Sequence, residues 1–180
     1  GNTETLSGGL VGHNLSLDGY PAIVQDSYAS GTVSGGSAIG GLIGKMEGGN
    51  VSNSYSSATV TGSEGASAGG LIGAFAPGYS APRLSASYST GIVSEGAFVG
   101  GLIGQDLVGS GIADSYWDMD TSGISDPARG AGNVANDPGI TGLTTQQLKS
   151  GLPAGFSPSI WKEKAKINNG YPYLLDNSPE

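Results

Sequence analysis

The stretch Gly40-Gly41-Leu42-Ile43-Gly44, followed after a short linker by Val51-Ser52-Asn53-Ser54-Tyr55, decides the fold of this chain. The first block, Gly-Gly-Leu-Val/Ile-Gly, occurs in four copies, which begin at Gly8, Gly40, Gly69 and Gly100. The second block has an apolar residue, any residue, then Asp, Asn or Ala, then Ser and Tyr. Its four copies end at Tyr28, Tyr55, Tyr88 and Tyr116. Two linked blocks that recur in the same order indicate internal repetition.

The spacing of the repeat predicts a solenoid. Successive copies of the first block lie 32, 29 and 31 residues apart. The linkers between the blocks vary in length, over residues 13–23, 45–50, 74–83 and 105–111, so one corner of each coil should carry variable loops. Val, Ile, Thr and Tyr favour strands, and 34 glycines in 180 residues oppose helices. We therefore predict an all-β parallel β-solenoid (β-helix) of about four coils, with Leu, Val/Ile and Tyr in internal ladders. The glycines suit corners with positive φ or a close approach between coils.

The repeat ends at Tyr116, and the remainder has a different composition. Residues 117–142 are rich in Gly, Asp, Ser and Pro and are typical of an irregular loop. A short helix is predicted over 144–149, with Thr144 as its N-cap and Gly151 just beyond its end. A solenoid needs a cover for its last coil. We therefore predict a solenoid over 1–116 and an irregular C-terminal capping segment over 117–180, in which Trp117 and Trp161 pack on the last coil.

Composition excludes several classes of function. A net charge of −8 without a basic cluster argues against nucleic-acid binding, which needs Lys and Arg to neutralise phosphates. No apolar run approaches the roughly 18 residues of a membrane-spanning helix. The absence of cysteine excludes a disulfide framework and a cysteine-zinc site. No signal peptide begins the sequence, so we expect a monomeric fragment of a longer chain.

The two blocks resemble the GLUG motif, named for its Gly-Leu-any-Gly core. This motif recurs in large bacterial surface proteins, including filamentous-haemagglutinin-like adhesins exported by two-partner secretion, and in some IgA-specific metallopeptidases. The cores here are Gly9-Leu10-Val11-Gly12, Gly41-Leu42-Ile43-Gly44, Gly70-Leu71-Ile72-Gly73 and Gly101-Leu102-Ile103-Gly104. The stretches Ser115–Asp118, Thr121–Gly123, Gly142–Leu148, Trp161 and Asn169–Leu174 resemble the ends of such arrays, whereas residues 133–140 form a longer insertion.

The resemblance implies a parallel β-solenoid in an exported, cell-surface protein of a Gram-negative bacterium, without a particular ligand. It does not extend to the peptidases, because His-Glu-x-x-His is absent and His13 is the only histidine.

One stretch has part of a calcium-binding pattern. Asp118, Asp120 and Ser122 alternate before Gly123, and Asp126 could add an oxygen. Calcium takes six to eight oxygen ligands, but Arg129 stands where a bidentate glutamate belongs. A structural turn is the favoured interpretation, with weak or no calcium binding as the expected result.

Other candidate sites are each better explained by structure. His13 is expected on a surface loop. Asp114 and Asp118 are close enough in sequence for acid/base chemistry by paired carboxylates, but structural or solvated roles are favoured for both. The repeated tyrosines could stack on sugars if exposed, but their spacing beside apolar residues favours packing. A regular threonine row that could bind ice is broken, because Ile92 follows Thr32 and Thr59. We predict no catalytic, cofactor or metal residue.

The sequence therefore predicts a non-enzymatic adhesin or stalk segment of a secreted bacterial surface protein. It would present loops to a host cell, a surface protein or a glycan. Two alternatives remain at this stage: a carbohydrate-active β-helix enzyme and a purely structural spacer.

Overall fold

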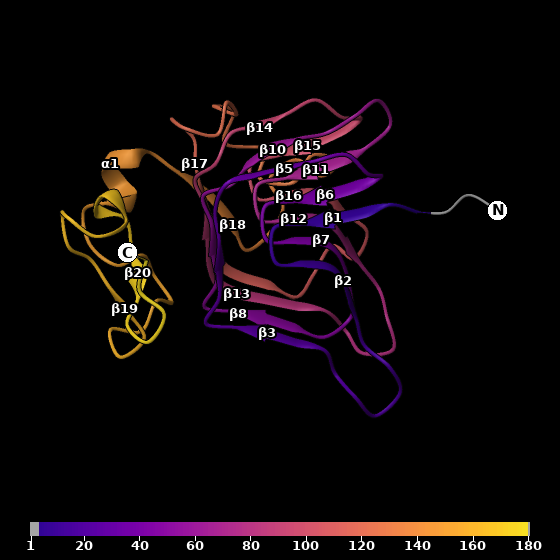
Figure 1. Ribbon diagram of the computed structural model, residues 1–180, viewed down its shortest axis with the longest axis horizontal. Helices are drawn as coiled ribbons and strands as arrows, with labels where there is room; N and C mark the ends of the chain where they lie inside the picture. Colours follow the sequence, from indigo (N-terminus) through magenta and orange to yellow (C-terminus); the bar gives the residue numbers. More distant parts are fainter. Residues whose placement is uncertain (1–3, 180) are drawn as a thin grey trace.

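The computed structural model describes residues 4–179 and shows an all-β parallel solenoid of about five turns (Figure 1). This confirms the predicted fold class and adds one turn to the predicted four. No helix in the described part of the chain is long and apolar enough to cross a bilayer. Helical structure there is limited to α1 (Thr145–Leu148) and a 3-10 turn at Asn168–Gly170.

Parallel sheets run along the solenoid, and in each of them strands from successive coils pair side by side. The sheet that leads into the pentapeptide contains β1 (Leu6–Gly8), β6 (Ala38–Gly40), β11 (Ser67–Gly69) and β15 (Phe98–Gly100). The sheet that leaves it contains β2 (Val11–Leu15), β7 (Ile43–Glu47), β12 (Ile72–Ala76) and β16 (Ile103–Asp106).

Two further sheets complete the turns. The second block forms β3 (Ile23–Gln25), β4 (Tyr28–Ala29), β8 (Asn50–Ser52), β9 (Tyr55–Ser56), β13 (Arg83–Ser89), β17 (Ile112–Asp118) and, beyond the repeat, β18 (Ile140–Leu143). The return strands are β5 (Thr32–Ser34), β10 (Thr59–Thr61) and β14 (Val93–Ser94). A small antiparallel pair, β19 (Trp161–Lys162) and β20 (Tyr173–Leu174), lies in the C-terminal segment.

The register between coils reproduces the alignment of the sequence repeat. Gly40 pairs with Gly8 on one side and Gly69 on the other, and Tyr55 pairs with Tyr28 and Tyr88. Equivalent side chains therefore lie above one another. The ladders at the centre of the molecule are the fully buried leucines and isoleucines Leu42, Leu71, Leu102, Ile43, Ile72 and Ile103.

The pentapeptide glycines are needed for close approach between coils. A Cβ at Gly40 would overlap the carbonyl oxygen of Ile43 and the amide nitrogen of Gly73 in the next coil. A Cβ at Gly41 would overlap the Ser56 hydroxyl. Both glycines lack a positive φ, so space and not backbone conformation requires them.

The second block contains a left-handed residue at its centre. Asp26, Asn53, Ala86 and Asp114 have φ between 46 and 49°. The serine that follows donates its hydroxyl to the carbonyl two residues earlier, at 2.8 Å for Ser54 to Ser52 and 2.8 Å for Ser87 to Ser85. The repeated serine thus closes a local bend and turns the next residue, tyrosine, away from the interior ladder.

Residues 117–143 add the fifth turn without any repeat block. Residues 119–139 have little regular structure, but the predicted irregular loop over 117–142 is wrong at both ends, because β17 runs to Asp118 and β18 begins at Ile140. The segment follows the course of a coil. Gly130 takes the place of the pentapeptide leucine, since its carbonyl accepts from the amides of Leu102 and Ile103, as Leu102 does from Leu71 and Ile72. The indole of Trp117 fills the adjoining space, against Gly101 and Gly130. The indole ring of Trp117 thus fills the space that a pentapeptide leucine fills in the other coils. The fifth turn therefore has no repeat block in its sequence.

The C-terminal segment, defined here as residues 144–179, lies along the flank of the solenoid beside β17 and β18 (Figure 1). Trp117 packs inside the last coils as predicted, but Trp161 does not, because it contacts Tyr55 and Tyr88 of the second and third coils. The side-chain amide of Asn177 reaches the carbonyl of Asp26 in the first coil. The boundary at 116/117 falls inside β17, and the division into 1–116 and 117–180 stays a prediction about folding units.

Candidate functional site

The repeated tyrosines form a stacked ladder beneath the C-terminal segment. Tyr28 and Tyr55 stack with ring centroids 5.1 Å apart, and Tyr55 and Tyr88 at 5.0 Å. Tyr55 and Tyr88 are buried together with Phe156 and Trp161. This burial confirms that Tyr55 and Tyr88 pack and do not form an exposed platform for sugars. The predicted internal tyrosine ladder is wrong in its position, because the rings lie outside the leucine and isoleucine interior and are covered by the C-terminal segment.

The hydroxyl of Tyr88 makes two hydrogen bonds to the C-terminal segment. Its hydroxyl donates to the carbonyl of Pro172 and accepts from the Asn168 side-chain amide at 2.8 Å. Burial, with the nearby Tyr55 hydroxyl, holds the pKa of Tyr88 well above its ordinary value. The Tyr116 hydroxyl donates to the carbonyl of Ala154 at 3.0 Å. These bonds fasten the segment to the solenoid.

The Asp118 carboxylate is committed to structure and does not line an open calcium loop. One oxygen accepts from the amides of Asp120 and Thr121, at 2.9 and 3.3 Å. The other accepts from the Thr145 hydroxyl at 2.7 Å and the Tyr171 hydroxyl at 2.6 Å. Burial and the bond to Asp118 raise the pKa of Tyr171 to about 12, so the phenol stays protonated and keeps donating.

The remaining acidic candidates near this turn do not assemble into a site. The second carboxylate, Asp120, accepts from the Thr145 amide at the start of α1, and the Ser122 hydroxyl bonds within its own turn, to Ile124. Asp114 is the exposed, left-handed residue of the fourth second block. Since Asp118 is fully buried, the two carboxylates do not share a solvent-facing cleft.

His13 lies on strand β2 and not on a loop, which corrects that prediction. Its Nε2 lies 3.2 Å from a carboxylate oxygen of Glu47, and Lys45 lies between Glu47 at 3.3 Å and Glu4 at 3.0 Å. These groups form a partly exposed row of ionisable side chains across the first two coils. Such surface pairs contribute about 0–1 kcal/mol each to stability.

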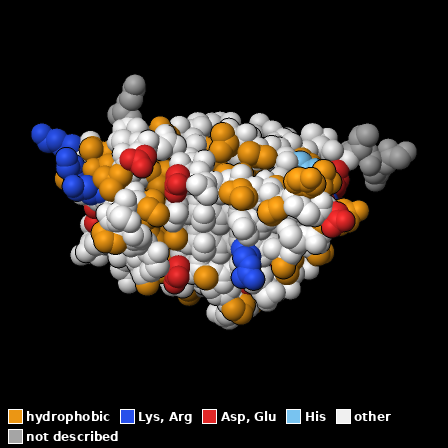
Figure 2. Space-filling model, turned by 90° about the horizontal axis from the view of Figure 1, so that it is seen from below, with side chains coloured by type: hydrophobic (Ala, Val, Ile, Leu, Met, Phe, Trp, Pro, Cys, Tyr) orange, Lys and Arg blue, Asp and Glu red, His pale blue; other side chains and the backbone are white. Residues whose placement is uncertain are grey.

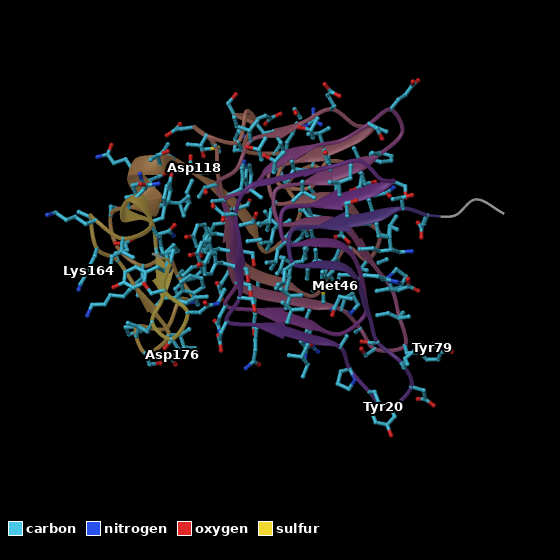
Figure 3. The ribbon with its side chains drawn as sticks, in the orientation of Figure 1. Tyr20, Met46, Tyr79, Asp118, Lys164 and Asp176 are labelled. Carbon is cyan, nitrogen blue, oxygen red and sulfur yellow. The ribbon has the colours of Figure 1, made fainter. Side chains whose placement is uncertain are left out.

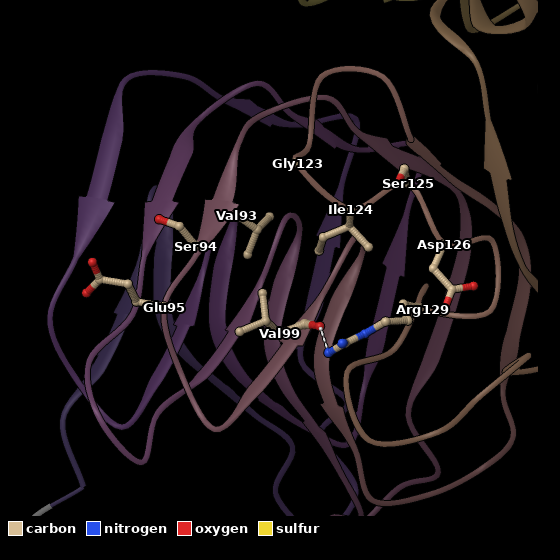
Figure 4. Close-up of a pocket in the computed structure, with 9 residues that line it drawn as sticks. All are labelled: Val93, Ser94, Glu95, Val99, Gly123, Ile124, Ser125, Asp126 and Arg129. Atoms are coloured by element: carbon tan, nitrogen blue, oxygen red, sulfur yellow. Dashed lines mark hydrogen bonds between the residues drawn. The ribbon is translucent and has the colours of Figure 1, made fainter.

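A hollow opens where β14 meets the irregular fifth turn (Figure 4). Its charged lining residues are Glu95, Asp126 and Arg129. Arg129 donates to the carbonyl of Val99 at 3.1 Å, and Asp126 accepts from the amide of Ala128 at 3.0 Å. Both groups are partly engaged with the backbone, and the rest of the lining combines Ser94 and Ser125 with the apolar side chains of Val93, Val99 and Ile124.

The corner loops carry the most prominent exposed aromatic side chains. Tyr20 is 78% exposed and Tyr79 is 76% exposed, and both project from the same end of the molecule, away from the sheets (Figure 3). Tyr20 belongs to the loop of the first coil and Tyr79 to the loop of the third. The loop of the second coil is a short Gly48–Gly49 turn between them.

Hydrogen bonds hold these two loops together across the short turn. The Ser80 hydroxyl donates to the Ser16 hydroxyl at 3.0 Å, and the amide of Gly49 donates to Ser80 at 2.9 Å. A small antiparallel bridge between Leu17 and Tyr20 closes the first loop. A shallow depression beside Tyr79 is lined by Glu47, Pro77 and Gly78. We call this loop pair, residues 16–22 and 77–82, the tyrosine corner.

The sequence predicted variable loops at this corner but not their two tyrosines. Tyr20 and Tyr79 fall outside the repeat, and no periodic signal distinguishes them. On the face in Figure 2, hydrophobic side chains lie in small groups among uncharged ones, with few charges. The tyrosine corner is therefore the candidate binding site.

Comparison with known proteins agrees with this architecture. The GLUG motif family model matches residues 3–34 and 35–61, so the chain contains a GLUG repeat region. No curated protein matches the sequence. A solved structure, "putative immunoglobulin A1 protease from Bacteroides ovatus", is similar in fold, with a TM-score of 0.65 and 20% sequence identity. The match covers 97% of this chain and 54% of that one, so this chain spans about half the length of its structural neighbour.

A parallel β-solenoid with GLUG repeats defines the class of this protein, and both features fit a secreted, extracellular repeat protein. At 20% identity the Bacteroides ovatus structure shows a shared fold only.

Proposed function

We propose that this chain is a non-enzymatic attachment segment of an extracellular bacterial surface protein. In this proposal the solenoid presents the tyrosine corner to a cell, a surface protein or a glycan. The observation that carries it is the pair of exposed side chains, Tyr20 and Tyr79, on two loops that are tied to each other.

The rigidity of the scaffold supports this function. Binding is weakened when flexible loops must be ordered, and a preformed surface avoids much of that cost. The tyrosine corner is ordered by Ser16, Ser80 and the Leu17–Tyr20 bridge, and it rests on stacked coils whose central leucines are fully buried.

The chemistry of the two side chains supports contact with a partly apolar ligand. A tyrosine combines a large apolar ring with a hydroxyl that donates and accepts, which suits surfaces where one side is apolar and the other wet. A sugar ring or an extended peptide offers such a surface. The adhesin type, two-partner secretion and a Gram-negative cell surface are further parts of the proposal, supported by the GLUG match over 3–61.

The alternative of a carbohydrate-active enzyme has less support. Asp118, which it would need, is buried and accepts four hydrogen bonds. The protease name of the Bacteroides ovatus protein belongs to a chain of which only 54% is covered. In our proposal the solenoid is a non-catalytic part of whatever protein contains it.

A glycan array combined with a hydrolysis assay on the same glycans tests the function. We expect binding without turnover, and we expect the double variant Tyr20→Ala/Tyr79→Ala to bind at least about tenfold more weakly. Ile92→Ala, which truncates another exposed side chain away from the corner, should bind as the parent does. Turnover would favour the enzyme. Binding to nothing, on glycans and on host-cell surfaces, would favour the spacer.

A further inference from the structure

The C-terminal segment is the basic part of an acidic chain. Residues 144–179 contain four lysines and two acidic residues, whereas residues 4–143 contain three basic and twelve acidic residues. With His13 neutral, the two parts therefore carry net charges of +2 and −9. All four lysines of the segment are exposed, namely Lys149, Lys162, Lys164 and Lys166. Figure 3 shows Lys164 at the end of the molecule opposite to Tyr20 and Tyr79.

Two of these lysines line a hollow of about 300 Å³ on the segment. Lys149 directly follows α1 and Lys164 comes shortly after β19, so the hollow lies between two parts of the segment. Glu163, Ala165 and Asn169 also line it. The salt bridges of residues 4–179 all lie in the first two coils, so neither lysine is neutralised by an ion pair. We call this feature the lysine hollow.

The side chain of Lys149 is held in place within the lysine hollow. Its ammonium group lies 4.1 Å from the centre of the Tyr171 ring, which attracts a cation to its face. The Tyr171 hydroxyl donates to the buried Asp118 at 2.6 Å, and this bond fixes the ring. The stem of Lys149 passes beside Gly170, where an added Cβ would lie 3.6 Å from the Lys149 Cδ. A ligand therefore meets a positive charge that is already ordered, which lowers the cost of binding.

We propose that the lysine hollow binds one acidic sugar residue of a polysaccharide, with the sugar carboxylate between Lys149 and Lys164. A carboxylate beside an ammonium group forms a charge-assisted hydrogen bond. The Asn169 side-chain amide can donate and accept, and the Glu163 carboxylate accepts, so both suit the hydroxyls of a sugar. This site goes beyond the proposed function of the tyrosine corner and does not depend on it.

Other anions match the lysine hollow less well. The phosphodiesters of nucleic acids offer acceptors but no donor, so Glu163 would repel them. Double-stranded DNA also carries one charge about every 1.7 Å of its axis, and a bound duplex would bring many of these charges near the acidic solenoid. An acidic polysaccharide spaces its carboxylates at least one sugar apart, and each acidic sugar supplies hydroxyl donors as well. The mixed lining of the hollow therefore favours the sugar acid.

Calorimetric titration of the full chain with trigalacturonate, at about 50 mM salt, tests the site. The matched ligand is the methyl ester of the same trisaccharide, which keeps the sugar rings and removes the charges. We expect the acid to bind and the ester to bind at least about tenfold more weakly. Higher salt should weaken binding of the acid, because salt screens exposed charges.

Single variants locate the ligand. Lys164→Gln should weaken binding of trigalacturonate by about fivefold. Lys162→Gln is the matched control, because it removes the same charge from an exposed neighbour that does not line the hollow, and it should cost less than about twofold. Glu163→Ala should also weaken binding, although it removes a negative charge, because the sugar hydroxyls lose an acceptor. The double variant Tyr20→Ala/Tyr79→Ala should bind as the parent does, so a failure here is distinguishable from failure of the tyrosine corner.

Several results would overturn the proposal. No binding of the acid, or equal binding of the acid and the ester, would exclude recognition of the carboxylate. Equal losses in Lys162→Gln and Lys164→Gln, or tighter binding by Glu163→Ala, would mean that diffuse charge alone attracts the ligand. Equally tight, Lys164-dependent binding of duplex DNA or of vesicles with anionic lipid would assign the hollow to phosphate groups. Unfolding of each variant at the parent temperature is expected for these surface changes and checks that the fold is intact.

Discussion

The interior of the solenoid and the outer face that carries Tyr28, Tyr55 and Tyr88 are both ladders of repeated side chains. The two ladders are covered from solvent by different parts of the chain. Leu42, Leu71 and Leu102 are buried by the neighbouring coils, which are close in sequence. Tyr55 and Tyr88 point outward and are buried by the C-terminal segment, with bonds such as Asn168 to Tyr88 that span 80 positions. A repeat can therefore build its own interior, whereas its outer aromatic face depends on a segment that does not repeat.

The largest effect expected from this contrast follows removal of the C-terminal segment. A chain ending at Leu143 keeps all five turns but uncovers Tyr55, Tyr88 and Tyr116. Each buried side chain of this size contributes roughly 1.5–3 kcal/mol, so several kcal/mol should be lost. Hydrogen exchange should accelerate most in β9, β13 and β17 and least in β6 and β11, and the chain should become sensitive to protease.

A chain ending at Asp118 is the matched comparison, because it loses the fifth turn as well. It should also expose the interior ladder at Leu102 and aggregate. If the chain ending at Leu143 stayed soluble with unchanged exchange at Tyr88, the C-terminal segment would be an independent module and not a cover.

A pair of leucines at the same repeat position tests the interior by itself. Leu71 is fully buried between two coils, whereas Leu10 in the first coil is 51% exposed. Leu71→Ala should lower the free energy of unfolding by about 2–5 kcal/mol through lost burial and a cavity. Leu10→Ala should stay within about 0.5 kcal/mol of the parent. Denaturant unfolding measures both, and similar losses at the two positions would mean that the first coil is covered in solution.

The smallest expected effect concerns the bend that turns the tyrosines outward. Ala86 holds a φ of 46°, which is unfavourable for alanine, whereas Asn53 at the equivalent position tolerates it. Asn53→Ala should cost about 1 kcal/mol, and Ala86→Asn should gain up to about 1 kcal/mol. Ala113→Asn, at an exposed site of ordinary backbone, is the control. A loss of stability in Ala86→Asn would show that packing against the C-terminal segment outweighs the backbone term.

Predictions from the sequence succeeded where a property repeats with each coil. The pentapeptide and the second block align in the register of the sheets, and the variable linkers lie at one corner. The sequence also predicted a local interaction correctly, because Thr144 is the N-cap of α1. The side chain of Gln147 completes the capping box. The role of the pentapeptide glycines was open between two explanations, and only the position of the adjacent coil decides for close approach.

Predictions failed or were absent where a feature occurs once. The fifth turn has Gly130 and Trp117 in place of a leucine, so it leaves no repeat to detect. Trp161 was expected on the last coil because an open end needs a cover. It lies instead against Tyr55 and Tyr88, on the outer side of the second and third coils. Tyr20 and Tyr79 lie in loops without periodicity, and the hydrogen bond that joins the two loops, from Ser80 to Ser16, spans the short turn at Gly48–Gly49.

By itself the sequence determined the ladders, because identical residues at a constant spacing stack wherever parallel strands pair in register. It also determined the bends, through a left-handed residue, Asp or Asn in three of the four copies and Ala86 in the other, followed by a serine that bonds back to the chain. The tertiary structure alone decided on which face the tyrosines lie and what covers them. Those contacts join residues that no local rule relates, and their energies depend on burial, which exists only once the chain has folded.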